Sequence, residues 1–438
     1  MNWIELTCPQ RFGDAPEATP ETHRTDFQRD YDRLVFSAPF RRLQDKTQVF
    51  PLPGNKLVHN RLTHSLEVAS VGRSLGNMVV RLLSPTLPEA EQQAVAHIPS
   101  IVAAACLAHD MGNPPFGHSG EEAIRQYFVD HQDRYRTMLD EWEWADLTRF
   151  EGNANALRLL TQQLHGRRDG GFRLSYAVLA SVVKYPYAST AGRKKYGYFK
   201  AEAEAFARIA QRTGLPSNGQ GAHSRHPLAY LMEAADDICY QIMDIEDAHR
   251  LGLLGTEHTL ELYRNFFANE GPTLDRMART LREVTDPNEQ VSYLRAMAIG
   301  RLVDGCASAF VEQLGGIMRG EPARPLTESL SPTSLAAMRS IAQVAIGQVY
   351  SYPKVVEVEI AGFRIMGSLL DTFCAAVLDP HSQRNRKAYS LMPAQYRCPN
   401  DSSSYEKILS VLDFVAGMTD DYALKLFRLF QGIDLPSL

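Results

Sequence analysis

The stretch LAHDMGNPPFGHSGEE, residues 107–122, decides how the rest of the chain is interpreted. The eight residues before His109 are all apolar, which is typical of a helix that is buried on every side. A turn rich in glycine and proline ends that helix just after Asp110. A second helix is expected to begin at Ser119, with Glu122 completing a capping box. The pattern therefore predicts an imidazole and a carboxylate at the end of a buried helix, where a site can form.

The composition is that of an ordinary globular protein, because 44% of the 438 residues are hydrophobic and 22% are charged. The net charge of −5 argues against a generally basic surface that coats nucleic acid. Six scattered cysteines without a Cys-x-x-Cys pair favour reduced thiols over a disulfide framework. No apolar run approaches the roughly 18 to 20 residues of a membrane span, and no signal peptide is recognisable. We therefore expect a cytoplasmic protein that does not enter a membrane.

Helical patterns dominate the chain and predict an all-α fold with at most a small β element. The one convincing strand is Lys354–Ile360, whose apolar residues alternate with a period of two. Residues 1–25 are polar, carry several prolines and are expected to form a loose arm.

Histidines and carboxylates that suit a divalent metal ion occur on separate predicted helices. A His-Asp pair alone is weak, because roughly one is expected by chance in a chain with 13 histidines. His64 is a candidate third ligand for an ion at His109 and Asp110, and Asp236 is a candidate fourth. Imidazole and carboxylate together suit Mn, Fe, Zn, Ni or Mg. The alternative stays open at this point, because a single histidine is more often a core or surface residue than a ligand.

A polar stripe surrounds the candidate fourth ligand. Asp236, Tyr240 and Asp244 recur at a spacing of four and therefore share one face of a predicted helix, beside apolar neighbours. Such a stripe is unusual for a packed face, although an ordinary solvated face is an equally good interpretation. His118 follows Asp110 by eight residues across the turn, so it can approach a metal site without being a ligand and can serve as a general acid or base.

Several motifs occur in an order and at spacings that resemble a known family. They are NRLTHS at 60–65, HDMGNPPFGHSGE at 109–121, FEGNA at 150–154 and EAADDICY at 233–240, together with FRRLQDKTQVF at 40–50 and GMTDDYAL at 417–424. This set is similar to the HD-domain superfamily and, more closely, to the deoxyguanosinetriphosphate triphosphohydrolase family, which includes broader dNTPases. The likeness runs from about residue 25 to about residue 430. It implies an HD-domain helical metal-dependent phosphohydrolase fold, with a catalytic core at 26–260 and a C-terminal helical region at 261–438 packed on that core.

The resemblance also implies a reaction, in which dNTP is cleaved to deoxynucleoside and inorganic triphosphate. The positions of His64, His109, Asp110 and Asp236 would hold one divalent ion at the α-phosphate, and His118 and Glu121 would form the catalytic pair. The implied substrate contacts are Gln48 and Asp244 at the deoxyribose 3′-hydroxyl, Tyr240 on the sugar, and Arg61, Lys184, Tyr185 and Lys195 at the phosphates. Some relatives carry histidine where this chain has Asn113, which cannot act as an acid near neutral pH.

Two other functions are consistent with the sequence. HD proteins also hydrolyse other nucleotides or nucleic-acid ends, and the site residues alone do not choose the base. A nucleotide-binding or single-strand-DNA-binding regulator with weak activity is the second alternative. Its basis would be the basic residues between Arg24 and Lys46 and the cluster of Arg193, Lys194, Lys195 and Lys200. The resemblance further implies a homo-oligomer, hexamer or tetramer, with an activating nucleotide or single-stranded DNA as a possible partner.

Overall fold

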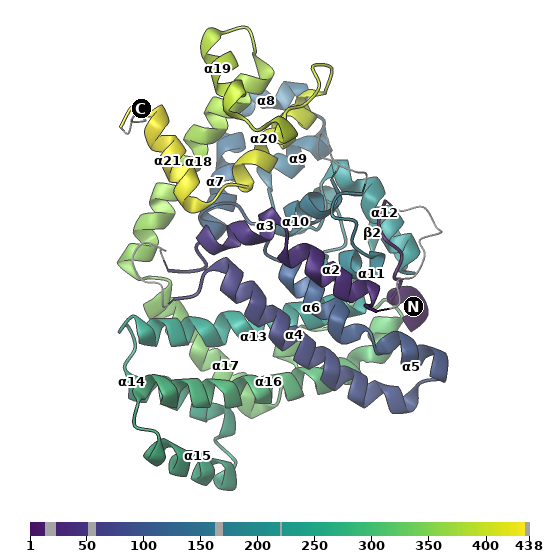
Figure 1. Ribbon diagram of the computed structural model, residues 1–438, viewed down its shortest axis with the longest axis vertical. Coiled ribbons are helices and arrows are strands. Elements are labelled where there is room, and N and C mark those ends of the chain that lie inside the picture. The colour runs from purple at the N-terminus through teal and green to yellow at the C-terminus, as the bar shows by residue number, and fades with distance from the viewer. Residues whose placement is uncertain (14–22, 51–57, 163–169, 220, 434–438) are drawn as a thin grey trace.

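The computed structural model describes residues 1–13, 23–50, 58–162, 170–219 and 221–433. These residues form helices almost throughout, and the described part of the chain contains one two-stranded antiparallel hairpin (Figure 1). The expected all-α fold with at most a small β element is confirmed.

The helices before the hairpin are α1 (Trp3–Leu6), α2 (Asp26–Val35), α3 (Ala38–Arg42), α4 (Arg61–Leu83), α5 (Glu89–Val95), α6 (Ile98–Ala108), α7 (Gly117–Asp130), α8 (Gln132–Tyr135), α9 (Glu141–Thr148), α10 (Gly152–Thr161), α11 (Tyr176–Val182) and α12 (Ala203–Arg212). The hairpin consists of β1 (Ser217–Gly219) and β2 (Ala222–His223). The helices after it are α13 (Pro227–Arg250), α14 (Thr256–Arg264), α15 (Gly271–Glu283), α16 (Pro287–Met318), α17 (Pro332–Val344), α18 (Pro353–Leu378), α19 (Gln383–Leu391), α20 (Ser404–Ala416) and α21 (Asp420–Phe430).

The first hydrophobic core is built around α4, α6 and α13, which pack against one another, while α16 packs on α4 and α13. All residues of α6 from Ile101 to Ala108 are buried, which confirms the predicted buried helix. Helix α4 approaches the start of α6 closely at Gly76, where a Cβ atom would lie 2.7 Å from the Cα of Pro99. This close packing holds the end of α6 next to the beginning of α4.

The second hydrophobic core joins distant parts of the chain, because α18 packs against α7, α20 and α21 (Figure 1). The turn after α6 leads from one core to the other: Met111 belongs to the first core, and Ile124 of α7 belongs to the second. Both cores contain residues from either side of residue 260. The division of the chain at that residue stays a prediction.

The predicted strand at Lys354–Ile360 is wrong, because these residues lie within α18. Pro353 occupies the first helical turn, where a proline without an N–H donor is tolerated. The buried residues of α18 then recur at helical spacing, among them Gly362, Ile365, Met366 and Leu369. Ile360, one of the alternating apolar residues, is 68% exposed, so the period of two reflected no buried face. The longer helical pattern determined the structure.

Two further expectations are also wrong, one about the start of α7 and one about the N-terminal residues. Helix α7 begins at Gly117, with Phe116 in a left-handed conformation at φ 63° as its N-cap, and no side chain caps it. Ser119 therefore lies inside the helix and forms no capping box.

The first residues of the expected loose arm are not loose, because Trp3 and Leu6 of α1 are buried in the first core. Residues 14–22 of that arm lie outside the described residues.

Helix α18 is long and apolar enough to cross a membrane when only its length and composition are considered. Its apolar part is interrupted by Arg364 and Asp371, so it is not the uninterrupted apolar run whose absence the sequence indicates. Half of its most apolar window is buried inside the protein, and core helices often pass the same criterion.

Candidate active site

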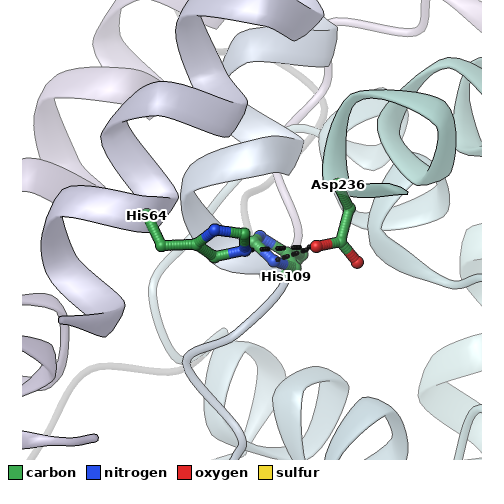
Figure 2. Close-up of side chains that lie close together, drawn as sticks. All are labelled: His64, His109 and Asp236. Carbon is green, nitrogen blue, oxygen red and sulfur yellow. Dashed lines mark hydrogen bonds and ion pairs between the residues drawn. The ribbon is translucent and has the colours of Figure 1, made fainter. Parts of the chain in front are cut away.

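Side chains from α4, α6 and α13 meet at one point in the structure (Figure 2). His64 lies in the first turn of α4, His109 directly follows α6, and Asp236 lies on α13. The Nε2 atoms of His64 and His109 are 3.2 Å and 3.4 Å from the same Oδ1 of Asp236. One potential ligand atom from each of the three residues lies within 4.8 Å of the others. Two imidazoles and a carboxylate in this arrangement can hold a single ion.

The ring of His109 is oriented by its backbone. Its Nδ1 lies 2.5 Å from the carbonyl oxygen of Cys106, which can only accept, so Nδ1 carries the proton in the neutral ring. The buried Nε2 has no hydrogen-bond partner and faces Asp236 with its lone pair. Burial lowers the pKa of His109, but the carboxylates of Asp110 and Asp236 raise it above its usual range. An unpartnered nitrogen beside two carboxylates fits a bound cation.

Asp110 lies at the edge of the three-residue group. Its Oδ2 accepts from Nη1 of Arg61 at 2.7 Å, and its Oδ1 accepts from Nδ2 of Asn113 at 2.6 Å. Oδ1 is 3.5 Å from Nε2 of His109. Burial would raise the pKa of Asp110, but the guanidinium of Arg61 and the neighbouring imidazoles hold it well below its usual range. Asp110 is therefore a carboxylate beside the group, and Asn113 orients it.

Lys184 is brought to the other side of Asp236. Its Nζ donates to Oδ2 of Asp236 at 2.6 Å, so the two oxygens of this carboxylate are divided between Lys184 and the imidazoles. Burial would raise the pKa of Asp236, but the charges of Lys184 and His109 lower it well below its usual range. The carboxylate is thus ionised and available as a ligand.

His118 and Glu121 form a hydrogen-bonded pair on the first turns of α7. Nδ1 of His118 is 3.2 Å from Oε2 of Glu121, and the imidazole is 78% exposed while the carboxylate is 6% exposed. Oε1 of Glu121 accepts from the backbone N–H of Gly152 at 2.7 Å. A Cβ at Gly152 would lie 2.5 Å from that oxygen and 2.2 Å from Oδ1 of Asn113. A side chain at this position would therefore have to displace Glu121 or Asn113.

Glu121 and Glu122 both contact Arg125, but Glu121 is buried and Glu122 is exposed. Burial would raise the pKa of Glu121, but the hydrogen bond and charge of His118, with the charge of Arg125, lower it. Glu122 binds Nη1 of Arg125 at 3.0 Å on the protein surface. The role expected for Glu122 as a capping acid is wrong, and the contact of Glu121 with His118 is the one that orients the imidazole.

The polar stripe of α13 is mostly enclosed. Asp244 is buried and accepts a hydrogen bond from the hydroxyl of Tyr350 at 2.8 Å, and the ring of Tyr350 stacks on Tyr240 with centroids 5.9 Å apart. Burial raises the pKa of Asp244 to about 8, although the bond from Tyr350 opposes this effect. The stripe is therefore not a solvated face. Gln48 carries a buried Oε1 atom that has no hydrogen-bond partner, so this oxygen is available to accept a hydrogen bond from a ligand.

Lys195 lies near the pair of His118 and Glu121, and it also approaches the ring of Tyr185. A surface pocket of about 440 Å³ is lined by His118, Glu121 and Lys195, among others. Nζ of Lys195 is 5.8 Å from the centre of the Tyr185 ring. The Thr47–Asn60 bridge places the segment of Gln48 beside the start of α4. The described contacts do not join Gln48 directly to Asp244.

Comparisons with known proteins agree with this geometry. Residues 61–248 match the HD domain, and residues 329–429 match the phosphohydrolase-associated domain. The chain is 39% identical to the deoxyguanosinetriphosphate triphosphohydrolase-like protein of Synechocystis, over 99% of this chain and all of that protein. It is 38% identical to the protein of that description in Pseudomonas aeruginosa, over the full length of both. A deoxyguanosinetriphosphate triphosphohydrolase of Yersinia enterocolitica is 30% identical over 97% of each chain.

The chain belongs to the deoxyguanosinetriphosphate triphosphohydrolase-like family of HD-domain proteins. As a member of this family it is a phosphohydrolase. HD domains depend on metal, and the three-residue group supplies a possible site. The orphaned Nε2 of His109 shows that the residues present fit such an ion.

Sequence reasoning missed two residues that support the candidate site. Gly152 stood within the FEGNA motif, and its glycine was the signal of a close approach. Tyr350 had no signal, because it follows a π-helical turn at Ala345–Val349 in a segment without a motif. Such turns often occur at functional sites, but they are visible only in the backbone.

Proposed function

We propose that this protein hydrolyses deoxynucleoside triphosphates, dGTP or a broader set, to deoxynucleoside and inorganic triphosphate with the help of one divalent ion. The observation that carries this proposal is the convergence of His64, His109 and Asp236 from three helices, with the pair of His118 and Glu121 on the helix that follows. Mn, Mg, Fe, Ni and Zn all suit such a ligand set. Asp110 would complete the set after exchanging one of its present hydrogen bonds.

Cationic side chains around the ligand set suit a triphosphate. A bound ion would supply Lewis-acid stabilisation of charge on the phosphoryl oxygens. Arg61 presents a guanidinium at Asp110, and a Cβ at Gly117 would lie 2.7 Å from its Nη2, so it spans from the ligand set to the start of α7. Lys184, Tyr185 and Lys195 would hold the remaining phosphates, which offsets the acidic balance of the whole chain.

The exposed imidazole of His118 is the proton-transfer group in this proposal. Glu121 fixes the Nδ1 side of the ring, and Nε2 is left to face the substrate. A general acid or base of this kind contributes about 10² to 10⁴ in rate. Asn113 holds Asp110 through its amide and carries no proton that it could transfer near neutral pH.

The enclosed stripe on α13 would recognise the sugar. Gln48 and Asp244 would contact the 3′-hydroxyl, since an unpartnered amide oxygen and a buried carboxyl can both bond a hydroxyl group. Tyr240 would pack on the deoxyribose. Tyr350 supports both residues of α13 through its ring and its hydroxyl.

The remaining proposals concern partners and location. We infer a cytoplasmic homo-oligomer, hexamer or tetramer, that an activating nucleotide or single-stranded DNA can regulate. The regulator alternative is weakened by the structure, because the basic residues that were its basis are largely engaged. Arg24 pairs with Asp32, Lys46 is buried, and Lys200 pairs with Asp140.

Product analysis tests the reaction directly. The metal-loaded protein is incubated with each dNTP, alone and in mixtures, and the products are separated and identified. Deoxynucleoside with inorganic triphosphate is the expected result. Monophosphate with pyrophosphate would reject the proposed reaction, and turnover of only another nucleotide class would favour the alternative HD-type hydrolase. A sample stripped with a chelator and reloaded with each metal in turn is the control for metal dependence.

A further inference from the structure

The carboxylate of Asp420 joins two segments that are far apart in the sequence. Asp420 is the first residue of α21, and its side chain is buried. Oδ2 accepts from the backbone N–H of Thr47 at 2.8 Å, and Oδ1 accepts from the backbone N–H of Phe116 at 3.0 Å. We call this pair of bonds the Asp420 clamp. It lies in the GMTDDYAL motif, to which the proposed reaction assigns no role.

A buried lysine reinforces the same junction. Nζ of Lys46 donates to the carbonyl oxygen of Asn113 at 2.6 Å and to that of Ala416 at 2.7 Å. Its side chain therefore connects the turn after α6 with the end of α20. Lys46 and Thr47 are consecutive, so the segment before α4 is tied to the C-terminal helices and to the turn by neighbouring residues.

Both segments that the clamp holds lead to proposed substrate or catalytic residues. Thr47 directly precedes Gln48 and forms a backbone bridge with Asn60, next to the start of α4. Phe116 precedes the helix that carries His118 by one residue. Phe116 adopts a left-handed conformation that a residue with a side chain rarely takes, and surrounding contacts must maintain it. A Cβ at Gly362 of α18 would lie 3.1 Å from the Cβ of Phe116, so the C-terminal region packs directly on this residue.

We propose that Asp420 is a positioning residue, which fixes the Gln48 segment and the start of the His118 helix relative to each other. The inference rests on the proposed function for its effect on catalysis, although the clamp itself does not. A carboxylate suits this place, because each of its two oxygens accepts from one amide and the charge strengthens both bonds. Asp420, which lies in the phosphohydrolase-associated region, would thereby shape the active site without itself contacting the substrate.

Asp420→Asn is the sharpest variant, because it keeps the shape of the side chain but places an amide NH2 group against one of the two backbone donors. The matched control is Asp421→Asn, at the exposed neighbouring position of the same helix turn. We expect Asp420→Asn to lower kcat for dNTP hydrolysis about 10² fold, with metal content unchanged and a much smaller change in KM. The preference for a dNTP over the matching 2′,3′-dideoxynucleotide should also shrink, since Gln48 is displaced. Asp421→Asn should leave all of these unchanged.

Hydrogen exchange provides a measurement that does not depend on the substrate. Amides in residues 43–50 and 113–118 should exchange faster in Asp420→Asn than in Asp421→Asn, both as full-length proteins. Asp420→Glu keeps the charge and is the second variant if the first fails to fold, with an intermediate loss of kcat expected. Equal kcat and equal exchange in the 420 and 421 variants would overturn the clamp. A wild-type protein without dNTP turnover would overturn the proposed function instead, and the exchange result would then decide the clamp alone.

Discussion

The imidazoles of the proposed metal set and the imidazole of His118 are held in opposite ways. The side chains of His64 and His109 are each 3% exposed and lie at the ends of helices of the first core, whereas that of His118 is 78% exposed. His118 stands on α7, whose buried face belongs to the second core. The candidate active site therefore lies where two cores meet.

This difference suggests separate structural requirements for metal binding and for proton transfer. The ligand set is assembled by packed helices, so binding an ion requires little rearrangement. The imidazole proposed for proton transfer is exposed to solvent, and its position depends on Glu121, Gly152 and the contacts of the turn before α7. Variants on the two sides should consequently fail in different ways. Loss of metal and loss of proton transfer are separable measurements.

The largest loss of turnover is expected from substitution of a buried histidine of the proposed metal set. His109→Ala should lose the bound metal and lower turnover by at least about 10⁴ fold, because several kcal/mol of Lewis-acid stabilisation is removed. Elemental analysis and a triphosphate-release assay measure the two results. Full metal content in this variant would contradict the ligand assignment. Asp110→Ala compares the residue at the edge of the set, and it too should lose metal.

Substitution of the exposed His118 should lower turnover without loss of metal. His118→Ala should keep its metal and its thermal stability, while turnover falls about 10² to 10⁴ fold because no group transfers the proton. The same two assays apply, with His131→Ala, at the exposed residue that directly follows α7, as the control for loss of a histidine. Nearly full turnover in His118→Ala would show that the pair is not catalytic.

Gly152→Ala tests the support of the exposed side. The added Cβ would lie too close to Glu121 and Asn113, so the orienter of His118 should shift. We expect turnover to fall about 10² fold, with metal content close to that of the wild type. Gly255→Ala, where a Cβ would meet nothing within 4 Å, is the matched glycine control. Equal activity in both variants would contradict the predicted displacement of Glu121.

The smallest expected effect is on the free energy of unfolding, through the ion pairs of His59. Burial lowers the pKa of His59, but hydrogen bonds to Asp247 and Glu67 raise it from 6.5 to about 10. Because the folded-state pKa is raised, the stabilisation is fully present below about pH 6.5 and is lost as the pH rises through about 10. Urea unfolding of wild type and His59→Gln should therefore differ most near pH 6. A difference that does not change with pH would contradict this ion network.

Some contacts of the site could be expected from sequence because they are local. His118 and Glu121 are three residues apart on a helix, so their proximity follows from helix geometry. Long-range partners carried no such signal. The bond from Tyr350 to Asp244 and the bonds of Asp420 join residues more than 100 positions apart. The helix start at Gly117 was missed because a left-handed Phe116 is maintained by tertiary packing and not by residue preference.

The sequence by itself determined the helical class, the buried α6 and the types of side chain delivered at its end, because periodicity and turn residues act over short distances. The motifs also identified the family. Only the tertiary structure decided that Asp110 faces Arg61 and Asn113, and that residues 354–360 continue a helix. It alone decided that the C-terminal helices hold the turn before His118. Those outcomes depend on which surfaces pack together, and packing selects partners by shape and hydrogen bonding across the whole chain.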